Sequence, residues 1–296
     1  GCNADSVSEY VAAALLCLAR RHGFGLEGRT LGVIGVGNVG SRVVRKAQAL
    51  GMRVLQNDPP RQRAAEADGE SGHPFLPLEQ VLAESDVVTL HVPLTRAGQD
   101  ATFHMANRRF FDALKPGCVF IDSARGAVVD SPALARALAD GRVAHAVLDT
   151  WEGEPDIPLD LLERVDLGTP HIAGYSFDGK VRGTEMVYAG ACRHLQRAAA
   201  WTAAPLLPDP PVPSVTLDAA GEPAEALLHG LVRRVYDIEA DDAGLRRLRA
   251  DDRARRFDAL RKHYPVRREF PFTTVHAPGA DAALLARIRG LGFHLP

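Results

Sequence analysis

The segment LGVIGVGNVG, residues 31–40, decides the fold of this chain. The apolar residues 31–34 predict a strand, and a helical pattern begins directly after three closely spaced glycines. In such a turn Gly35 permits the tight bend, Gly37 lets a pyrophosphate approach the backbone, and Gly40 lets helix and strand pack closely. The helix N-terminus adds free N–H groups and positive potential. The segment therefore predicts a strand, turn and helix that bind a dinucleotide.

An aspartate at the end of the next predicted strand narrows the choice of dinucleotide. Asp58 follows Gly40 by 18 positions, where a carboxylate accepts hydrogen bonds from the adenosine ribose hydroxyls. Its negative charge would repel the additional 2′-phosphate of NADP, so NAD is the expected cofactor. Arg61 and Arg63 stand close enough to weaken that preference.

Short apolar runs alternate with helical patterns through the first half of the chain. Because the runs are almost continuously apolar, both faces of the sheet are expected to be covered, which indicates an α/β fold with a doubly wound parallel (Rossmann) sheet. Strands are expected at residues 31–34, 53–56, 87–91, 118–122 and 144–148, with helices at 39–50, 78–83, 108–114 and 132–139. A further helix is predicted at 6–21, with Ser6 and Glu9 as a capping box and Gly23 as its end.

A proline-rich segment, residues 204–213, divides the remainder of the chain. It cannot continue the helix expected at 180–200 and is predicted to be an extended linker. Beyond it, a separate small α/β unit is expected, with helices at 225–238, 253–263 and 281–289 and a strand at 273–276. The predicted division is an interdomain helix at 1–24, a nucleotide-binding domain at 25–175, a returning helix at 176–203, the linker at 204–213 and a C-terminal domain at 214–296.

Composition excludes several classes of protein. The 296 residues carry 35 lysines and arginines against 37 aspartates and glutamates, a net charge of −2, so no broad positive field would attract nucleic acid or a membrane surface. The apolar run at 11–19 is too short to span a bilayer. The four cysteines lie far apart, without the close pairs of a zinc site, so we expect no metal and a reducing, cytoplasmic location.

Three side chains that suit hydroxy-acid chemistry follow successive predicted strands. Arg125 follows residues 118–122, Glu154 follows 144–148, and His171 follows the next apolar stretch. A guanidinium matches a carboxylate bidentately, and histidine has a pKa suited to accepting a hydroxyl proton near neutrality. A neighbouring carboxylate such as Glu154 would orient the imidazole and favour its charged form. These residues are expected to converge beside a bound nicotinamide.

The chain resembles the NAD-dependent D-2-hydroxyacid dehydrogenases over almost its whole length. The resemblance rests on the glycine motif, on SARGAVVD at residues 123–130, on the Glu-Pro pair at 154–155 and on HIAG at 171–174. Residues 151–155 (WEGEP), Tyr175, residues 179–184 (GKVRGT) and the C-terminal unit are most similar to the branch that oxidises 4-phospho-D-erythronate in pyridoxal 5′-phosphate biosynthesis.

The resemblance implies a role for individual residues. His171 is the expected general acid/base, Glu154 its paired carboxylate, and Arg125 the residue that holds the substrate carboxylate and carbonyl. Tyr175 is expected to contact the substrate. Cofactor contacts are expected at the three glycines, Asp58, Ser123 and Arg125, on the pyrophosphate at Asn38 and Val39, and around the nicotinamide half at Val92, Ala124, Asp149 and Gly174.

The implied substrate, a small phosphorylated 2-hydroxy acid, also requires cations for its phosphate. Lys180 and Arg182 lie near the site in sequence, and Arg267 and Arg268 in the tail are hypothesised to reach it across a dimer. The family's C-terminal unit serves dimerisation, which implies a homodimer.

The beginning of the chain departs from the family. Members carry an N-terminal segment that builds most of the substrate domain, followed by a helix like residues 6–21. Because this chain starts at that helix, with Gly1, we expect an upstream segment and expect the chain by itself to bind NAD but to lack turnover. Two alternatives remain open: a relative acting on 3-phosphoglycerate or on glyoxylate/hydroxypyruvate, and a non-catalytic, NAD-sensing interaction protein on the same scaffold.

Overall fold

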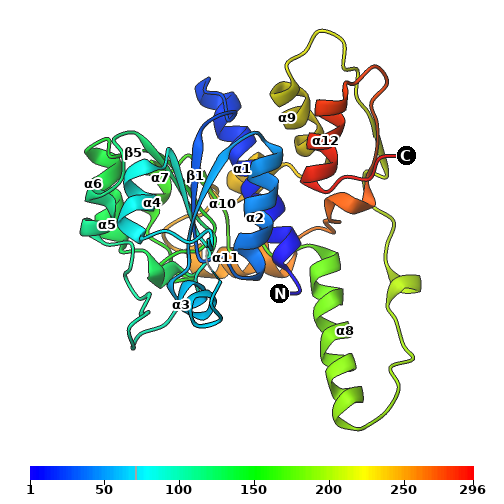
Figure 1. Cartoon of the computed structure of the whole chain (residues 1–296), viewed down its shortest axis with the longest axis horizontal. Coiled ribbons are helices and arrows are strands. Elements are labelled where there is room, and N and C mark those ends of the chain that lie inside the picture. Colours follow the sequence, from blue (N-terminus) through cyan, green and yellow to red (C-terminus); the bar gives the residue numbers. More distant parts are fainter. Residues whose placement is uncertain (71) are drawn as a thin grey trace.

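The computed structural model describes residues 1–70 and 72–296, and its centre is a six-stranded parallel sheet (Figure 1). The strands lie in the order β2-β1-β3-β4-β5-β6. Strand β2 lies on one side of β1 and the later strands lie on the other, so the strand order reverses between β1 and β3. Ligands of doubly wound sheets bind at such a reversal, outside the carboxyl ends of the strands. The strands are β1 Thr30–Ile34, β2 Arg53–Asn57, β3 Val87–Leu90, β4 Cys118–Asp122, β5 Val143–Leu148 and β6 Leu167–Gly168.

The sheet confirms the predicted Rossmann fold. All five strands predicted with bounds are present, with ends within one residue of the prediction, and the two-residue β6 lies in the apolar stretch expected before His171. The helices are α1 Ala4–His22, α2 Asn38–Ala49, α3 Pro59–Ala67, α4 Leu78–Glu84, α5 Arg108–Asp112, α6 Ser131–Ala139, α7 Leu159–Arg164, α8 Phe177–His194, α9 Ala224–Val235, α10 Ile238–Leu245, α11 Arg253–Lys262 and α12 Ala282–Leu291. None of the helices in the described part of the chain combines the length and apolarity needed to cross a bilayer.

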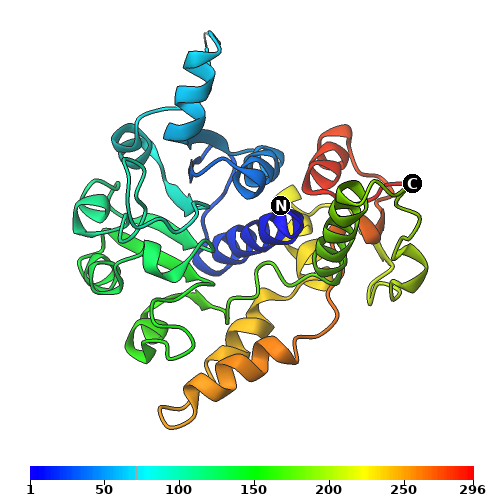
Figure 2. The same cartoon turned by 90° about the horizontal axis from the view of Figure 1, so that it is seen from below.

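Helix α1 is buried along most of its length, between the sheet and the C-terminal helices (Figure 2). Its end at Gly23, with φ of 69°, is as predicted. The predicted capping box is wrong, because the helix already begins at Ala4 and both proposed capping side chains make tertiary contacts instead. The Ser6 hydroxyl donates to the carbonyl of Ala173 at 2.7 Å, and Glu9 accepts a hydrogen bond from the backbone N–H of Phe270 at 2.8 Å.

The C-terminal part shares its core with the nucleotide-binding part, through contacts that the sequence did not indicate. Helices α9 and α12 pack on α1 and α2, and apolar side chains of both parts form one cluster. On the other side, the carboxylate of Asp242 in α10 accepts from the backbone N–H of Gly168 at 2.7 Å. Strands β7 Ser214–Thr216 and β8 Thr274–His276 pair in parallel beside these helices. The predicted domain boundaries themselves stay a prediction.

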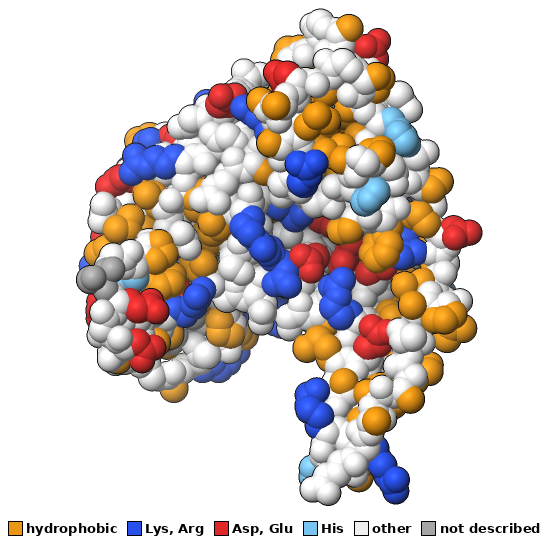
Figure 3. All heavy atoms as spheres, turned by 45° about the vertical axis from the view of Figure 1, so that its right-hand side comes forward, with side chains coloured by type: hydrophobic (Ala, Val, Ile, Leu, Met, Phe, Trp, Pro, Cys, Tyr) orange, Lys and Arg blue, Asp and Glu red, His pale blue; other side chains and the backbone are white. Residues whose placement is uncertain are grey.

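Helix α8 projects from the body, and the segment after it returns alongside (Figure 1). The proline-rich segment begins with a short 3-10 helix, Ala204–Leu206, before it becomes extended. Several large apolar side chains of this arm are exposed, and Figure 3 shows charged side chains of both signs gathered where the arm meets the body. The exposed apolar residues are Met186, Val187, Leu195, Trp201 and Leu206.

A tail segment, residues 267–270, joins α1 to the beginning of α8. Arg267 donates to the carboxylate of Glu9 in α1 at 3.2 Å, and Arg268 donates to that of Asp178 in α8 at 2.9 Å. Glu269 accepts from the hydroxyl of Ser176 at 2.8 Å. Burial raises the pKa of Glu9 to about 7, against the opposing charge of Arg267. The segment therefore fixes the chain directly after the loop that contains His171.

Candidate active site

Two neighbouring cavities lie at the carboxyl ends of the strands, at the point where the strand order reverses. The larger, of about 440 Å³, is lined by the glycine turn and Asp58. The smaller, of about 290 Å³, is lined by Arg125 and His171. Both are bordered by the segment from His91 to Pro93. Two adjoining cavities that meet beside a glycine turn suit the two halves of a dinucleotide.

The glycine turn has the geometry that the sequence predicts. Gly35 has a φ of 84°, and a Cβ on it would lie 2.8 Å from the backbone of His91. A Cβ on Gly40 would overlap the carbonyl oxygen of Gly35, so α2 packs directly on the turn. Apart from the adjoining residues, no atom of the described residues lies within 4 Å of the Cβ position of Gly37, which leaves open space beside the backbone. The structure thus fits a pyrophosphate at Gly37, although that contact stays a prediction.

Replacing Gly37 and Gly40 separately with alanine distinguishes cofactor binding from folding. Gly37→Ala is expected to leave the melting temperature almost unchanged and to weaken NADH binding at least about tenfold, because the new methyl group occupies the space for the pyrophosphate. Gly40→Ala is expected to lower the melting temperature, because α2 must move away from the turn. Calorimetric unfolding and NADH fluorescence titration measure the two effects. Equal NADH affinity in Gly37→Ala and the unaltered protein would contradict the assignment.

Asp58 caps α3 and fixes the glycine turn. Its carboxylate accepts from the backbone N–H of Val36 at 2.8 Å and from that of Arg61 at 3.1 Å. Arg61 donates to the carbonyl of Val36, and Arg63 pairs with Asp100. Both arginines therefore have partners within the chain, while Asp58 borders the larger cavity. This arrangement retains the negative charge that favours NAD over NADP.

His171 and Glu154 form a hydrogen-bonded pair behind the smaller cavity. Nδ1 of His171 donates to Oε2 of Glu154 at 2.7 Å, and the other carboxylate oxygen accepts from the backbone N–H of Trp151 at 2.6 Å. The backbone of His171 has a φ of 56°, in the left-handed region, and its backbone N–H donates to the carbonyl of Asp149 at 2.7 Å. The backbone and the carboxylate together orient the imidazole, so that Nε2 is the nitrogen available to a substrate.

The surroundings of His171 favour its protonated form. Burial lowers the pKa of His171, but the hydrogen bond to Glu154 and the charge of Asp149 more than offset this effect, and its pKa lies above the ordinary value. Burial also raises the pKa of Asp149 and raises that of Asp122 to about 7. The imidazole is therefore suited to hold a proton received from a substrate hydroxyl.

Gly126 brings the loop of Arg125 against the loop of Glu154. A Cβ on Gly126 would overlap the backbone carbonyl of Trp151. Arg125 itself is exposed, lines the smaller cavity and donates to the carbonyl of Ala124 at 2.6 Å. The close approach of the two loops sets the position of the guanidinium relative to the imidazole.

Most of the other predicted cofactor and substrate residues line the smaller cavity. These are Val39, Val92, Ser123, Ala124, Asp149, Gly174 and Tyr175. The hydroxyl of Ser123 is buried without a hydrogen-bond partner in the described structure, as expected of a group that waits for a ligand. Asn38, predicted to contact the pyrophosphate, lines neither cavity, and its side chain lies beside Gly1.

Sequence reasoning missed His91, which borders both cavities. Burial lowers its pKa to about 3, so the ring is neutral, and its Nδ1 is buried without a partner among the described residues. Its position at the carboxyl end of the strand predicted at 87–91 could have indicated it, because ligands bind at the carboxyl ends of such strands.

The cations near the site are partly those expected. Lys180 Nζ lies 4.3 Å from the ring centroid of Tyr175, and the guanidinium carbon of Arg261, which the sequence did not indicate, lies 5.7 Å from the same centroid. The hypothesis that Arg267 and Arg268 reach the substrate is wrong. Both are buried, and their guanidinium groups bind the carboxylates of α1 and α8, since a buried charge requires a partner nearby.

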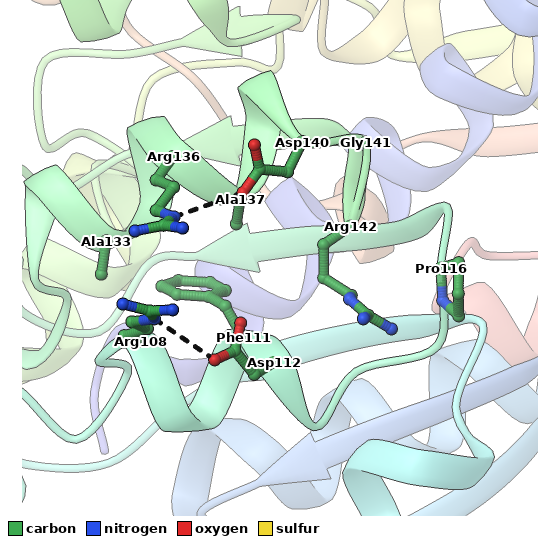
Figure 4. Close-up of a pocket in the computed structure, with 10 residues that line it drawn as sticks. All are labelled: Arg108, Phe111, Asp112, Pro116, Ala133, Arg136, Ala137, Asp140, Gly141 and Arg142. Carbon is green, nitrogen blue, oxygen red and sulfur yellow. Dashed lines mark hydrogen bonds and ion pairs between the residues drawn. The ribbon is translucent and has the colours of Figure 1, made fainter.

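A third cavity, of about 180 Å³, lies between α5 and α6 and contains none of the predicted site residues (Figure 4). Arg108 and Arg136 face it, but Arg108 Nε lies 3.5 Å from Asp112 and Arg136 Nε lies 3.3 Å from Asp140. Each arginine thus has a carboxylate partner four residues further along the chain. The cavity shares no lining residue with the two cavities at the strand ends, so it is not part of that site.

Comparison with known proteins agrees with this geometry. The family described as D-isomer specific 2-hydroxyacid dehydrogenase, NAD binding domain, matches residues 14–173, and a domain of unknown function matches residues 206–292. The chain is 50% identical over 288 residues to the erythronate-4-phosphate dehydrogenase of Salinibacter ruber, covering 95% of this chain and 73% of that protein. It is 46% identical over 293 residues to the enzyme of the same name from Edwardsiella ictaluri, covering 99% and 75%.

Among solved structures, D-lactate dehydrogenase from Aquifex aeolicus, complexed with NAD and lactic acid, is similar with a TM-score of 0.51 and 30% identity. The similarity covers 65% of this chain and 68% of that one. The sheet, the glycine turn and the histidine–glutamate pair had already indicated an NAD-dependent oxidoreductase that acts on a CH–OH group. The chain therefore belongs to the family of D-isomer specific 2-hydroxyacid dehydrogenases.

Proposed function

We propose that this protein oxidises 4-phospho-D-erythronate at C2 to (R)-3-hydroxy-2-oxo-4-phosphooxybutanoate, with NAD as acceptor, in pyridoxal 5′-phosphate biosynthesis. The observation that carries the proposal is the pair of His171 and Glu154, with Nδ1 and Oε2 2.7 Å apart, behind a cavity that Arg125 also lines. The two relatives named erythronate-4-phosphate dehydrogenase, at 50% and 46% identity over nearly the whole chain, support this substrate.

Each of the three side chains has a distinct task in the proposed reaction. Arg125 holds the substrate carboxylate through paired hydrogen bonds and thereby presents C2 to the imidazole. His171 accepts the proton of the C2 hydroxyl at Nε2. Glu154 keeps the ring in the required tautomer and stabilises the imidazolium that forms. NAD, when bound across the two cavities, supplies the acceptor for the C2 hydride.

The substrate assignment is tested by turnover. The protein is expected to form NADH with 4-phospho-D-erythronate at a higher kcat/KM than with 3-phosphoglycerate or glycolate. A preference for either of the latter would indicate another member of the family. Binding of NADH without turnover of any 2-hydroxy or 2-keto acid would favour a non-catalytic NAD sensor.

The substrate phosphate is assigned to Lys180 and Arg261, which flank the ring of Tyr175. The double variant Lys180→Ala/Arg261→Ala is expected to raise KM for 4-phospho-D-erythronate at least about tenfold, because a charged hydrogen bond contributes roughly 1.5–3 kcal/mol. KM for unphosphorylated D-erythronate is expected to change little. Lys262→Ala, an exposed neighbour on α11, is the matched control. An unchanged KM for the phosphorylated acid in the double variant would refute the assignment.

The proposal includes a homodimer formed through residues 214–296 and a cytoplasmic location. The free thiols of all four cysteines are compatible with a reducing compartment.

A further inference from the structure

Two histidines and an aspartate lie close together at the amino ends of the strands, opposite the cofactor cavities. His22 is the last residue of α1, His145 lies in the first half of β5, and Asp166 directly precedes β6. A helix of 19 residues spans roughly 28 Å, so His22 is far from Asn3, which borders the smaller cavity at the other end of α1 (Figure 1). The cluster is therefore separate from the proposed active site.

The three side chains converge on one oxygen atom. Oδ1 of Asp166 lies 2.7 Å from Nε2 of His22 and 3.2 Å from Nδ1 of His145. The two imidazole rings are stacked, with centroids 3.6 Å apart and an interplanar angle of 23°. Within the described ranges of the chain, this is the group of three such side chains whose ligand atoms all lie within 4.8 Å of one another.

The carboxylate is held in place independently of the histidines. Oδ2 of Asp166 accepts from the backbone N–H of Ala146 at 3.0 Å, and the backbone N–H of Asp166 donates to the carbonyl of Ala146 at 2.9 Å. The carbonyl of Asp166 accepts from Arg21 at 2.7 Å, and the other side of that guanidinium pairs with Glu239 at 3.0 Å. Oδ1 is thus left facing the two rings, and the charge of Arg21 is offset by Glu239.

We propose that His22, His145 and Asp166 form a Zn²⁺ site that ties the end of α1 to β5 and β6. Two imidazole nitrogens and one carboxylate oxygen are a donor set that Zn²⁺ accepts, and bonds of about 2.0–2.1 Å in a tetrahedral site place neighbouring ligand atoms roughly 3.3 Å apart. The observed separations of 2.7 and 3.2 Å from Oδ1 of Asp166 to the two nitrogens lie close to that spacing, and all three ligand atoms lie within 4.8 Å of one another.

The surroundings also suit a cation. The C-terminus of α1 contributes negative potential. The side chains of His22 and His145 are 27% and 24% exposed, which leaves the fourth position accessible to water. Zn²⁺ would bind the two ring nitrogens that now face Oδ1 of Asp166, and each neutral imidazole would carry its hydrogen on the other nitrogen. The three residues are far apart in sequence, so no spacing motif marks them, and the sequence alone predicts no metal.

The test uses the reduced, metal-free chain, titrated with Zn²⁺ by calorimetry and with Co²⁺ by visible absorption. The expected result is one saturable site, the intense visible bands of tetrahedral Co²⁺, and a higher melting temperature with Zn²⁺, because an ion that binds only the folded state stabilises it. His22→Gln and His145→Gln are each expected to weaken binding at least about tenfold, whereas His194→Gln, an exposed histidine on α8, is expected to leave it unchanged.

Two outcomes would overturn the proposal. Equal affinity in His22→Gln, His145→Gln and the unaltered chain would place the ion elsewhere. A near-ultraviolet thiolate-to-Co²⁺ charge-transfer band would show that cysteine, and not this cluster, binds the metal. The readouts do not depend on turnover, so they stay informative whatever the substrate of the enzyme.

Discussion

His171→Gln is expected to lower kcat for oxidation of the 2-hydroxy acid by roughly 10²–10⁴-fold, the range typical for loss of a general base. Glutamine retains a polar group of similar length but cannot accept the hydroxyl proton. NADH affinity and melting temperature are expected to stay close to those of the unaltered protein, because His171 is only partly buried and borders the cavity. Steady-state kinetics together with NADH titration separate the two effects.

Glu154→Gln tests the partner of His171, and the quantity measured is the dependence of kcat/KM on pH. Oxidation requires neutral His171, whose pKa is raised chiefly by its hydrogen bond to Glu154 against the opposing effect of burial. The kcat/KM for oxidation therefore rises with pH through this raised pKa. Without the carboxylate the pKa falls, so the rising limb moves to lower pH while the maximal rate decreases. A purely structural role for Glu154 would lower the rate without moving the limb, and full activity in His171→Gln would exclude His171 as the base.

Gly126→Ala is expected to lower kcat/KM by about 100-fold, because displacing a catalytic group by about 1 Å can have an effect of that size. The added methyl group would overlap the carbonyl of Trp151, so the loop of Arg125 and the loop that leads to Glu154 must separate. The distance between the guanidinium and the imidazole then changes, although both side chains are still present. Kinetics with the 2-hydroxy acid measure the effect.

Gly25→Ala is the control for Gly126→Ala, since among the described residues only its chain neighbours come within 4 Å of the Cβ position of Gly25. It is expected to retain full activity and stability. If Gly126→Ala kept its kcat/KM while its melting temperature fell, the contact between the loops would be structural only.

Local patterns sufficed to predict the centre of the fold. The five longer strands contain short apolar stretches, and the glycine turn specifies its own backbone geometry, so both are encoded in neighbouring residues. Helix α3 was missed because only Ala65 is buried in it, which leaves no apolar stripe. The capping box at Ser6 and Glu9 was wrong because its residues satisfy the local pattern but have stronger partners far away in sequence.

In the site, too, the features set by local patterns were predicted and those set by distant contacts were not. Arg125, Glu154 and His171 each follow a strand, so the topology predicts that they meet. The contacts of the tail depend on how α11 and residues 267–270 pack against distant parts of the chain. That packing cannot be inferred from neighbouring residues. The sequence therefore indicated Arg267 and Arg268 as phosphate ligands, whereas the structure brings Arg261 to Tyr175 and gives the other two arginines buried partners.

The tail segment at residues 267–270 makes the C-terminal part inseparable from the rest of the molecule. Its arginines are counter-ions for Glu9 and Asp178, which lie in elements on either side of the nucleotide-binding part. These ion pairs are buried together with apolar side chains that both parts of the chain contribute to one cluster. Cleavage in the proline-rich segment followed by loss of the tail would therefore remove both counter-ions and expose the faces of α1 and α2 on which α9 and α12 pack, so a truncation at that boundary is expected to be less stable than the whole chain.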